Sequence, residues 1–220
     1  MDKKLITACL VLVAFMAMAA VPALALASPV LKDKTGNVVV GGKIVAKNVG
    51  IVKFTTGANT IECTDASLTG TVVKNTGTEI DGEVSTAAFN DTNGSGQLVP
   101  CSNAAFGNVT VVPKKFPWCI VAKNTFAPDT FQISSAGCPG GGVMEFTLDA
   151  TFLEECTYTK AAPVTGSFTT GTEAAPSELS ISEEEFKLAS KGLGCPASGK
   201  LDLKLKLYTD ISGEPVVWIA

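Results

Sequence analysis

The sequence lacks two of the amino acids on which many enzyme active sites depend. None of its 220 residues is histidine, and all 17 basic residues are lysine, so arginine is absent as well. Without histidine the chain can form neither a Ser-His-Asp nor a Cys-His catalytic arrangement, and it lacks the commonest ligand for zinc and copper. Without arginine it cannot hold carboxylate or phosphate groups through a guanidinium fork. We therefore expect no enzyme, no catalytic residues and no cofactor site.

Positive charge is also scarce. The 17 lysines face 21 aspartates and glutamates, which gives a formal net charge of −4, and both signs are scattered along the chain. A nucleic-acid-binding protein needs a basic face, so this distribution argues against nucleic acid as a partner. The charge serves to keep the protein soluble.

Long hydrophobic runs are confined to the N-terminal region. Two lysines precede an apolar stretch from Leu5 to Ala20, and Ala25-Leu26-Ala27 follows shortly before a serine and a proline. A charged start, an apolar middle and small residues before the cut are typical of a secretory signal peptide. We predict that residues 1–27 are removed and that 28–220 form a single secreted domain without a membrane span. A membrane anchor is the alternative, because the run could cross a bilayer of about 30 Å.

Six cysteines lie beyond the predicted signal peptide, and an exported chain meets an oxidising compartment. An even number in that setting predicts three disulfides, although spacing alone does not choose among the possible connectivities. We favour sequential pairing, namely Cys63–Cys101, Cys119–Cys138 and Cys156–Cys195. Metal binding by thiolates is the alternative, but there is no C-x-x-C spacing and no histidine to complete a site. We expect no metal.

The strongest local signal is strict alternation of apolar and polar residues. From Lys200 to Tyr208 every odd-numbered residue up to 207 is leucine, and Met144–Phe152 shows the same period of two. This period indicates strands with one buried and one solvated face, as in an antiparallel sheet. Shorter β-branched or aromatic runs predict further strands at Val38–Val40, Ile51–Phe54, Thr60–Thr64, Ser67–Val73, Val109–Val112, Trp118–Val121, Phe131–Ile133, Thr157–Thr159 and Val216–Ile219.

Turn residues separate these runs, as in Asn90–Gly96 and Pro139–Gly142. The sequence therefore predicts an all-β fold, an antiparallel β-sandwich or barrel-like domain with three disulfides. The segment Ser182–Gly192 is ambiguous, because its Ser-x-x-Glu start and final glycine also fit a short helix. We favour a strand, since β neighbours on both sides usually override helix propensity.

Carboxylates supply the remaining candidates for chemistry. Glu79, Asp81 and Glu83 would share one face of a strand, either as part of a calcium site or simply as a solvated surface. The loop Asp91–Gly96 resembles a calcium loop but lacks a closing carboxylate, so a turn is the simpler interpretation. Glu154-Glu155 and Glu183–Glu185 are the clusters a glycoside hydrolase could use, although adjacent strand residues point to opposite faces.

Two further patterns have ordinary explanations. Sugar binding would use exposed aromatic rings, but Trp118, Trp218, Tyr158 and Tyr208 each lie in or beside a strand pattern, where core packing is expected. The glycines that follow Pro139 are not followed by the Lys-Ser/Thr pair of a phosphate-binding loop.

The cysteines belong to a wider order of landmark residues. Cys63–Val72 is followed by Phe89 and Cys101, then by Phe116-Pro117-Trp118-Cys119, Cys156-Thr157-Tyr158 and Cys195-Pro196. This layout resembles a group of exported, disulfide-containing β-rich bacterial proteins of the actinobacterial type. The first half is also similar to the alkane-oxidation activator family, which shares the order of cysteine, glycine, phenylalanine, cysteine and Pro-Trp. The resemblance implies an extracellular, non-enzymatic role near the cell surface, at an interface with apolar material.

We therefore expect a structural or interaction protein at the cell surface or in the extracellular matrix, whose partner is a cell-envelope or extracellular polymer. The alternatives are a secreted binding module for polysaccharide, lipid or hydrocarbon, and a carboxylate-dependent hydrolase. Their geometries differ. A concave apolar pocket or an exposed aromatic row favours the binding module, whereas two carboxyl groups about 5 to 9 Å apart in a cleft favour the hydrolase.

Overall fold

The computed structural model describes residues 29–123, 125, 129–134, 143–150, 153–190, 194–209 and 217–219. Every regular element in these ranges is a β-strand, which confirms the all-β prediction. The predicted signal peptide, residues 1–27, lies outside the described residues, as do Cys138 and the glycines after Pro139. In the part of the chain that is described, no helix has the length and hydropathy needed to cross a membrane.

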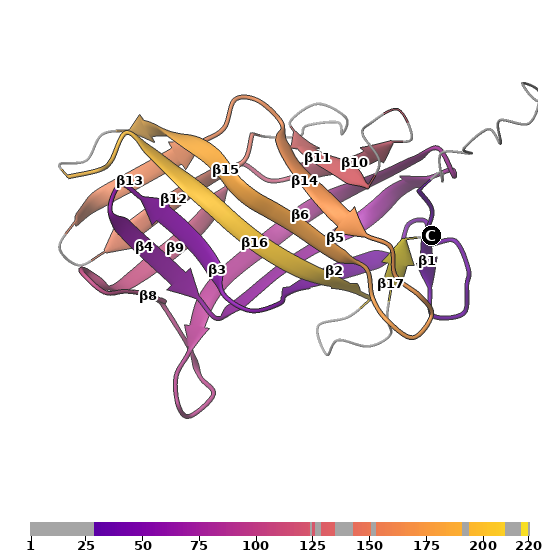
Figure 1. Cartoon of the computed structure of the whole chain (residues 1–220), viewed down its shortest axis with the longest axis horizontal. Coiled ribbons are helices and arrows are strands. Elements are labelled where there is room, and N and C mark those ends of the chain that lie inside the picture. Colours follow the sequence, from indigo (N-terminus) through magenta and orange to yellow (C-terminus); the bar gives the residue numbers. More distant parts are fainter. Residues whose placement is uncertain are drawn as a thin grey trace, which may run out of the picture.

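Seventeen strands follow one another in the described part of the chain (Figure 1). They are β1 (Leu31–Asp33), β2 (Lys43–Asn48), β3 (Val52–Thr56), β4 (Asn59–Cys63), β5 (Asp65–Asn75), β6 (Glu79–Thr92), β7 (Leu98–Val99), β8 (Cys101–Asn103), β9 (Gly107–Lys114), β10 (Trp118–Lys123), β11 (Thr130–Ser134), β12 (Glu145–Ala150), β13 (Leu153–Thr159), β14 (Val164–Thr169), β15 (Glu178–Ser190), β16 (Ser198–Tyr208) and β17 (Val217–Ile219).

Fifteen of the strands form one antiparallel sheet, which closes on itself twice. The first ring runs β6-β10-β11-β14-β15-β16-β2-β5 and returns to β6. The second ring runs β15-β13-β12-β9-β8-β4-β3-β16 and returns to β15. The β15–β16 pair belongs to both rings, and β1 and β17 form a separate two-stranded sheet. Of the two predicted architectures, the closed rings correspond to the barrel-like alternative.

A bulge in β15 lets this strand serve both rings. Pairing with β16 shifts register between Ile181 and Glu184, and Glu183 adopts a positive φ of 52°. Before the bulge β15 pairs with β14, and after it β15 pairs with β13. A bulge bends a strand and increases its twist, which redirects β15 from one ring to the other. The strand prediction for residues 182–192 is confirmed as far as Ser190.

The side chain of Glu184 helps to hold this bend. One of its carboxylate oxygens accepts a hydrogen bond from the Thr165 N–H at 2.7 Å, and the other is ion-paired with Lys160. Asp202 on β16 accepts a hydrogen bond from the Glu183 N–H at 2.8 Å. The polar groups freed by the bulge are thus satisfied by neighbouring strands.

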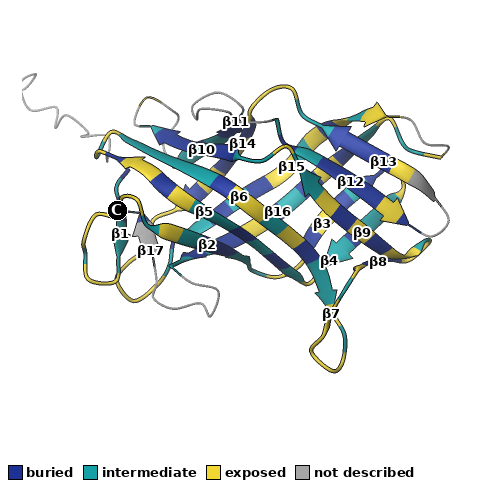
Figure 2. Cartoon of the chain, turned by 180° about the vertical axis from the view of Figure 1, so that it is seen from behind, coloured by how far each residue is buried: buried dark blue, intermediate teal, exposed yellow. Residues whose placement is uncertain are grey.

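The predicted alternation is present in β16, where Leu201, Leu203, Leu205 and Leu207 are buried and Lys204 is exposed. Figure 2 shows the same alternation of buried and exposed residues along several strands. In β12 the pattern has an exception, because Thr147 is buried among the polar positions. Its hydroxyl lies 3.0 Å from the hydroxyl of Thr157, so the buried polar group is paired.

Other predicted strands differ in detail. Val38–Val40 forms only an isolated bridge, between Lys32 and Val38, because Val38 and Val40 are exposed and bury no face. The sequence did not predict β1, β2, β7, β8 or β14. The remaining predicted runs coincide with named strands.

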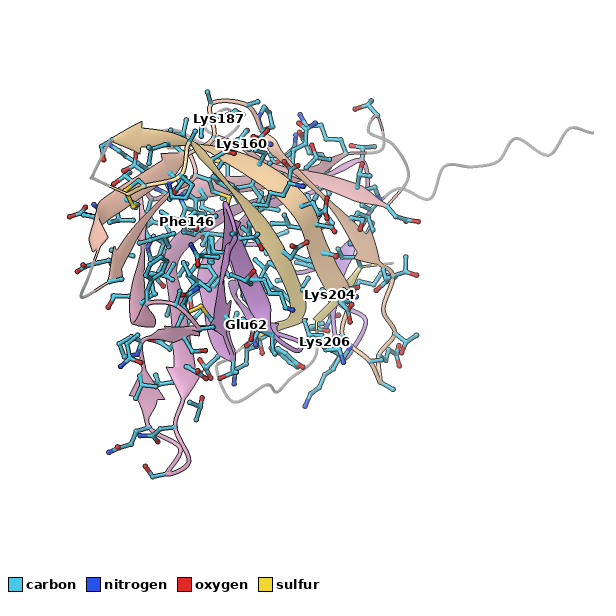
Figure 3. The ribbon with its side chains drawn as sticks, turned by 60° about the vertical axis from the view of Figure 1, so that its left-hand side comes forward. Glu62, Phe146, Lys160, Lys187, Lys204 and Lys206 are labelled. Carbon is cyan, nitrogen blue, oxygen red and sulfur yellow. A yellow bond between two sulfur atoms is a disulfide. The ribbon has the colours of Figure 1, made fainter. Side chains whose placement is uncertain are left out.

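A cluster of buried aromatic rings joins strands of both rings. Phe146 on β12 contacts the rings of Phe54, Phe89, Trp118 and Phe186, with centroids 5.1 to 5.6 Å apart. All of these side chains are buried. Figure 3 shows Phe146 among the strands, with the labelled lysines at the periphery. Edge-to-face aromatic contacts of this kind add specific packing to the burial of apolar area.

Two disulfides link strands of the second ring, and both have the predicted pairing. Cys63–Cys101 joins β4 to β8, whose ladder contains only two residue pairs. Cys156–Cys195 joins β13 to the segment just before β16. Cys119 is disulfide-bonded as well, but Cys138 lies outside the described residues. The pairing of Cys119 with Cys138 therefore stays a prediction.

Candidate functional site

The interior of the first ring contains a cavity of about 100 Å³. All eight strands of this ring contribute inward-facing residues to its wall, among them Ala46, Gly82, Ala122, Phe131 and Leu205. Successive side chains of a strand point to opposite faces, so alternate residues line the cavity. The first ring therefore contains a larger void than the second, where a pocket of about 30 Å³ is lined by residues that include Ile61, Val109 and Leu148.

Small residues at inward positions explain why this ring is hollow. Ala46, Gly70, Gly82 and Ala122 lie on four of its strands and line the cavity. Gly70 is required by close backbone packing, because a Cβ there would lie 2.3 Å from the Glu83 carbonyl oxygen. Gly82 is not crowded in this way, since the nearest atom to an added Cβ is the Thr71 carbonyl oxygen at 3.5 Å. Gly82 therefore leaves open a space that a side chain could occupy.

A third glycine fixes the position of an aromatic ring in the wall. A Cβ on Gly166 of β14 would lie 2.2 Å from the ring of Phe131, which lines the cavity from the adjacent strand β11. Phe131 thus lies flat against the backbone of Gly166. A larger residue at position 166 would push this ring into the cavity.

The hollow interior continues along the ring axis. A smaller void of about 10 Å³ shares Leu68, Ile120 and Phe131 with the main cavity and is also lined by Ile133 and Leu203. These two residues lie further along β11 and β16, toward the second ring. A second, smaller void therefore lies beside the main cavity on the side of the second ring.

Apolar side chains from outside the ring also contribute to the cavity wall. Leu31 of β1 and Ile219 of β17 line the cavity and are buried, and they are paired with each other. Figures 1 and 2 show β1 and β17 side by side at one end of the molecule, near the ends of β2 and β5. This small sheet lies over one end of the first ring.

The wall of the cavity is apolar. Thr71 and Glu83 belong to it, but their strand neighbours Val72, Gly82 and Val84 face inward, so their side chains point to the other face of the sheet. An apolar cavity stays dry and can accept an apolar molecule, because water there would find no hydrogen-bonding partners. The arrangement can bind an apolar group and offers no charged side chain with which to transform it.

The predicted acidic stripe Glu79, Asp81 and Glu83 is not a freely solvated face. All three residues are half-buried at the β6–β10 seam. Glu79 is ion-paired with Lys74 and Lys123, and the hydrogen bonds from these lysines hold the pKa of its carboxyl below the usual range. The stripe is therefore a partly solvated face of the sheet, on which Lys74 of β5 and Lys123 of β10 flank Glu79.

Asp81 has the opposite environment. One of its carboxylate oxygens, Oδ1, is buried with no hydrogen-bond partner, a situation found for no other side-chain oxygen or nitrogen atom in the described ranges. Burial raises the pKa of the Asp81 carboxyl, and the charge of Glu79 raises it further, against the opposing effect of Lys74 and Lys123. Asp81 is therefore a position at which a negative charge is disfavoured.

The other carboxylate candidates whose side chains are described are engaged by lysines or by the backbone, and the side chain of Glu154 lies outside the described residues. Glu155 pairs with Lys114, and Glu183, Glu184 and Glu185 pair with Lys200, Lys160 and Lys187 respectively. Asp91 accepts a hydrogen bond from Thr64, and in the loop after it Asn93 accepts hydrogen bonds from the N–H groups of Ser95 and Gln97. Within the described ranges, no group of three or more acidic or cysteine side chains is placed to hold a metal ion.

Two of the four aromatic candidates for sugar binding belong to the core, and Tyr208 is half-buried. Trp118 and Tyr158 are buried, and the Tyr158 hydroxyl donates a hydrogen bond to the Pro196 carbonyl oxygen at 3.1 Å. The side chain of Trp218 lies outside the described residues. Among the residues that are described, the exposed large hydrophobic side chains are all aliphatic, namely Val38, Val40, Ile51, Val73, Leu98 and Val112. No exposed row of aromatic rings is present in that part of the chain.

The sequence did not predict the cavity, although its lining follows the period of two. The segment Ile80–Val84 alternates in this way, and Ile80, Gly82 and Val84 are the residues that face the cavity. The glycine in this alternation gives no apolar signal by which the inward face could be recognised. No family model, curated protein or solved structure matches the chain.

Proposed function

We propose that this protein binds a small apolar molecule, or the end of an alkyl chain, inside the first ring of strands. The observation that carries this proposal is the apolar cavity of about 100 Å³. The walls come from eight paired strands, so the site is largely formed before any ligand arrives. A lipid or a hydrocarbon fits this site better than a polysaccharide, whose hydroxyl groups would find no partner in the wall.

The cost of the cavity supports a binding role over a purely structural one. Protein interiors are close-packed, and an internal void forfeits dispersion contacts and stability. A scaffold without a ligand would gain from larger side chains at Ala46, Gly82 and Ala122. The structural role at the cell surface or in a matrix remains the alternative if no apolar molecule binds.

We also infer that the protein is secreted after removal of residues 1–27 and that Cys119 pairs with Cys138. The two disulfides in the second ring support this inference, because such bonds persist in oxidising compartments. The actinobacterial-type resemblance agrees with it and stays a prediction.

Titration with n-hexane tests the proposed binding. We expect saturable amide chemical-shift changes confined to the eight strands of the first ring and to β1 and β17, which also line the cavity. Gly82→Val should abolish them, since its side chain would enter the cavity, whereas Ala88→Val, at an exposed position of the same strand, should bind as the unmodified protein does.

Two results of this titration count against the proposal. Shifts spread over the outer surface, or an unchanged response in a folded Gly82→Val variant, would show that hexane does not occupy the cavity. The absence of any saturable response would leave the structural role. Thermal unfolding of both variants shows whether they are folded.

A further inference from the structure

The small sheet of β1 and β17 is joined to the first ring differently from the way the ring strands are joined to one another. Within the ring, β5 and β6 share ten aligned residue pairs. Among the named strands of the described ranges, β1 and β17 pair with each other alone, in the register Leu31–Ile219, Lys32–Trp218 and Asp33–Val217, and β1 also makes the isolated bridge from Lys32 to Val38. The pair therefore rests on the ring without being part of its hydrogen-bonded ladder.

A buried asparagine attaches the β1 side of this pair to the ring. The Asn75 side chain, at the end of β5, accepts a hydrogen bond from the Leu31 N–H at 3.2 Å and donates one to the Leu31 carbonyl oxygen at 2.7 Å. Its amide also donates to the Val39 carbonyl oxygen at 3.0 Å. One side chain thus engages both backbone groups of the residue whose side chain lines the cavity.

A buried serine has the equivalent role on the β17 side. The Ser177 hydroxyl oxygen accepts a hydrogen bond from the Ile219 N–H at 2.7 Å, and the Gly171 N–H donates to the Ile219 carbonyl oxygen at 3.2 Å. Ser177 is fully buried and precedes β15. Leu31 and Ile219, which are paired across the small sheet, are therefore each held by one polar side chain of the ring.

These contacts can be exchanged for water at a modest cost, because each hydrogen bond contributes little net stability when both partners become solvated. By contrast, opening a seam of the ring would break a continuous ladder. The end of the cavity under Leu31 and Ile219 is thus the place where access requires the smallest disruption.

We propose that β1 and β17 act together as a cover that opens to admit the apolar ligand, with Asn75 and Ser177 as its latches. This inference rests on the proposed function of the cavity. Opening lifts Leu31 and Ile219 from the wall and exposes the interior to the medium, and closing restores the apolar enclosure. The two latches act as positioning residues and do not contact the ligand.

Asn75→Ala tests the cover, and Asn103→Ala is a matched control. Asn103 is also a buried asparagine with three hydrogen bonds to backbone groups, those of Thr60, Ala105 and Phe106, but it lies in the second ring. The exchange rate of n-hexane between free and bound states, measured by NMR relaxation dispersion, should rise about tenfold in Asn75→Ala. It should stay unchanged in Asn103→Ala.

A second measurement does not depend on any ligand. If the two strands open together, Asn75→Ala should accelerate hydrogen exchange of the Ile219 amide, which Asn75 does not contact, and Ser177→Ala should accelerate exchange of the Leu31 amide. Asn103→Ala should alter neither. Ser177→Ala removes a single hydrogen bond and keeps the test available if Asn75→Ala fails to fold.

The outcomes separate the cover from the proposed function. If hexane binds and its exchange rate is the same in Asn75→Ala and Ser177→Ala as in the unmodified protein, the cover is overturned and the binding site remains. Coupled amide exchange without hexane binding supports the cover and overturns the proposed ligand class. Acceleration confined to the amide that each latch contacts directly overturns concerted opening.

Discussion

At the scale of single residues, the acidic positions of β6 have opposite effects on stability. Glu79 is stabilised as a carboxylate by Lys74 and Lys123, whereas Asp81, two residues later, is disfavoured in its charged form by burial and by Glu79 itself. Since both lie at the β6–β10 seam, their titration reports on the closure of the first ring.

Asp81→Asn should stabilise the protein at neutral pH. A carboxyl whose folded-state pKa is raised binds more protons in the folded than in the unfolded state, so stability falls as the pH rises from the ordinary value of 3.8 through the folded value. Asparagine removes this cost. We expect a higher melting temperature for the variant at pH 7 and a difference that shrinks toward pH 3.8.

Glu79→Gln provides the control with the opposite sign, because the pKa of Glu79 is lowered in the folded state. Its contribution is present above the ordinary value of 4.5 and is lost as the pH falls through the folded value. This variant should melt at a lower temperature at pH 7. If the melting temperatures of both variants shifted equally and in the same direction, the environments of Asp81 and Glu79 would have been assigned wrongly.

Much of the residue pattern could be predicted from the sequence, and the exceptions have long-range causes. The leucines of β16 needed only the period of two. The ion pairing of Glu79 depends on Lys123, which is 44 positions away in the sequence and reaches Glu79 only when β10 pairs with β6. Gly82 gives no sign in the sequence that it faces a cavity.

At the scale of elements, β14 shows why a strand can be missed. Its residues alternate between buried Val164, Gly166 and Phe168 and exposed polar positions, but the glycine interrupts the apolar pattern. That glycine is required by the ring of Phe131 on β11, which is a tertiary constraint. Conversely, β15 was recognisable as a strand. Its bulge lies where the pairing partner of β15 changes from β14 to β13, which the sequence does not indicate.

The two disulfides of the second ring offer a test at this scale. The loops they close span 38 and 39 residues, so the chain-entropy model expects each to contribute about 4 kcal/mol. The double variants Cys63→Ala/Cys101→Ala and Cys156→Ala/Cys195→Ala should each lose roughly that amount in urea unfolding. Their similar loops make each variant the control for the other.

Hydrogen exchange should separate the two variants. Loss of Cys63–Cys101 should expose β4 and β8, because their ladder has only two pairs, whereas loss of Cys156–Cys195 should affect β13. Unchanged denaturation midpoints in both variants would contradict a stabilising role for these bonds.

At the scale of the whole molecule, the predicted processing of the chain can be measured directly. Protein recovered from the culture medium should begin at Ser28 and gain the mass of six hydrogens on reduction, two for each of three disulfides. A mass that includes residues 1–27 would contradict cleavage. A gain of four hydrogens would leave Cys119 and Cys138 without the bond that we predict between them.

The sequence predicted an all-β chain but could not predict the two closed rings. Strand order in a ring depends on which edges meet, and the closing pairs β6–β10 and β15–β16 are set by register and by bulges. The cavity follows from that closure, since Ala46, Gly82 and Ala122 share one interior only after three distant segments have paired.

Because the β15–β16 pair belongs to both rings, separating these two strands would break the closure of both rings at once. Occupancy of the first ring is therefore linked to the integrity of the second. A ligand that binds only the folded state shifts the unfolding equilibrium of the whole sheet by mass action. Bound lipid or hydrocarbon would then shield Cys63–Cys101 from reductants, although this bond lies in the other ring and does not line the cavity.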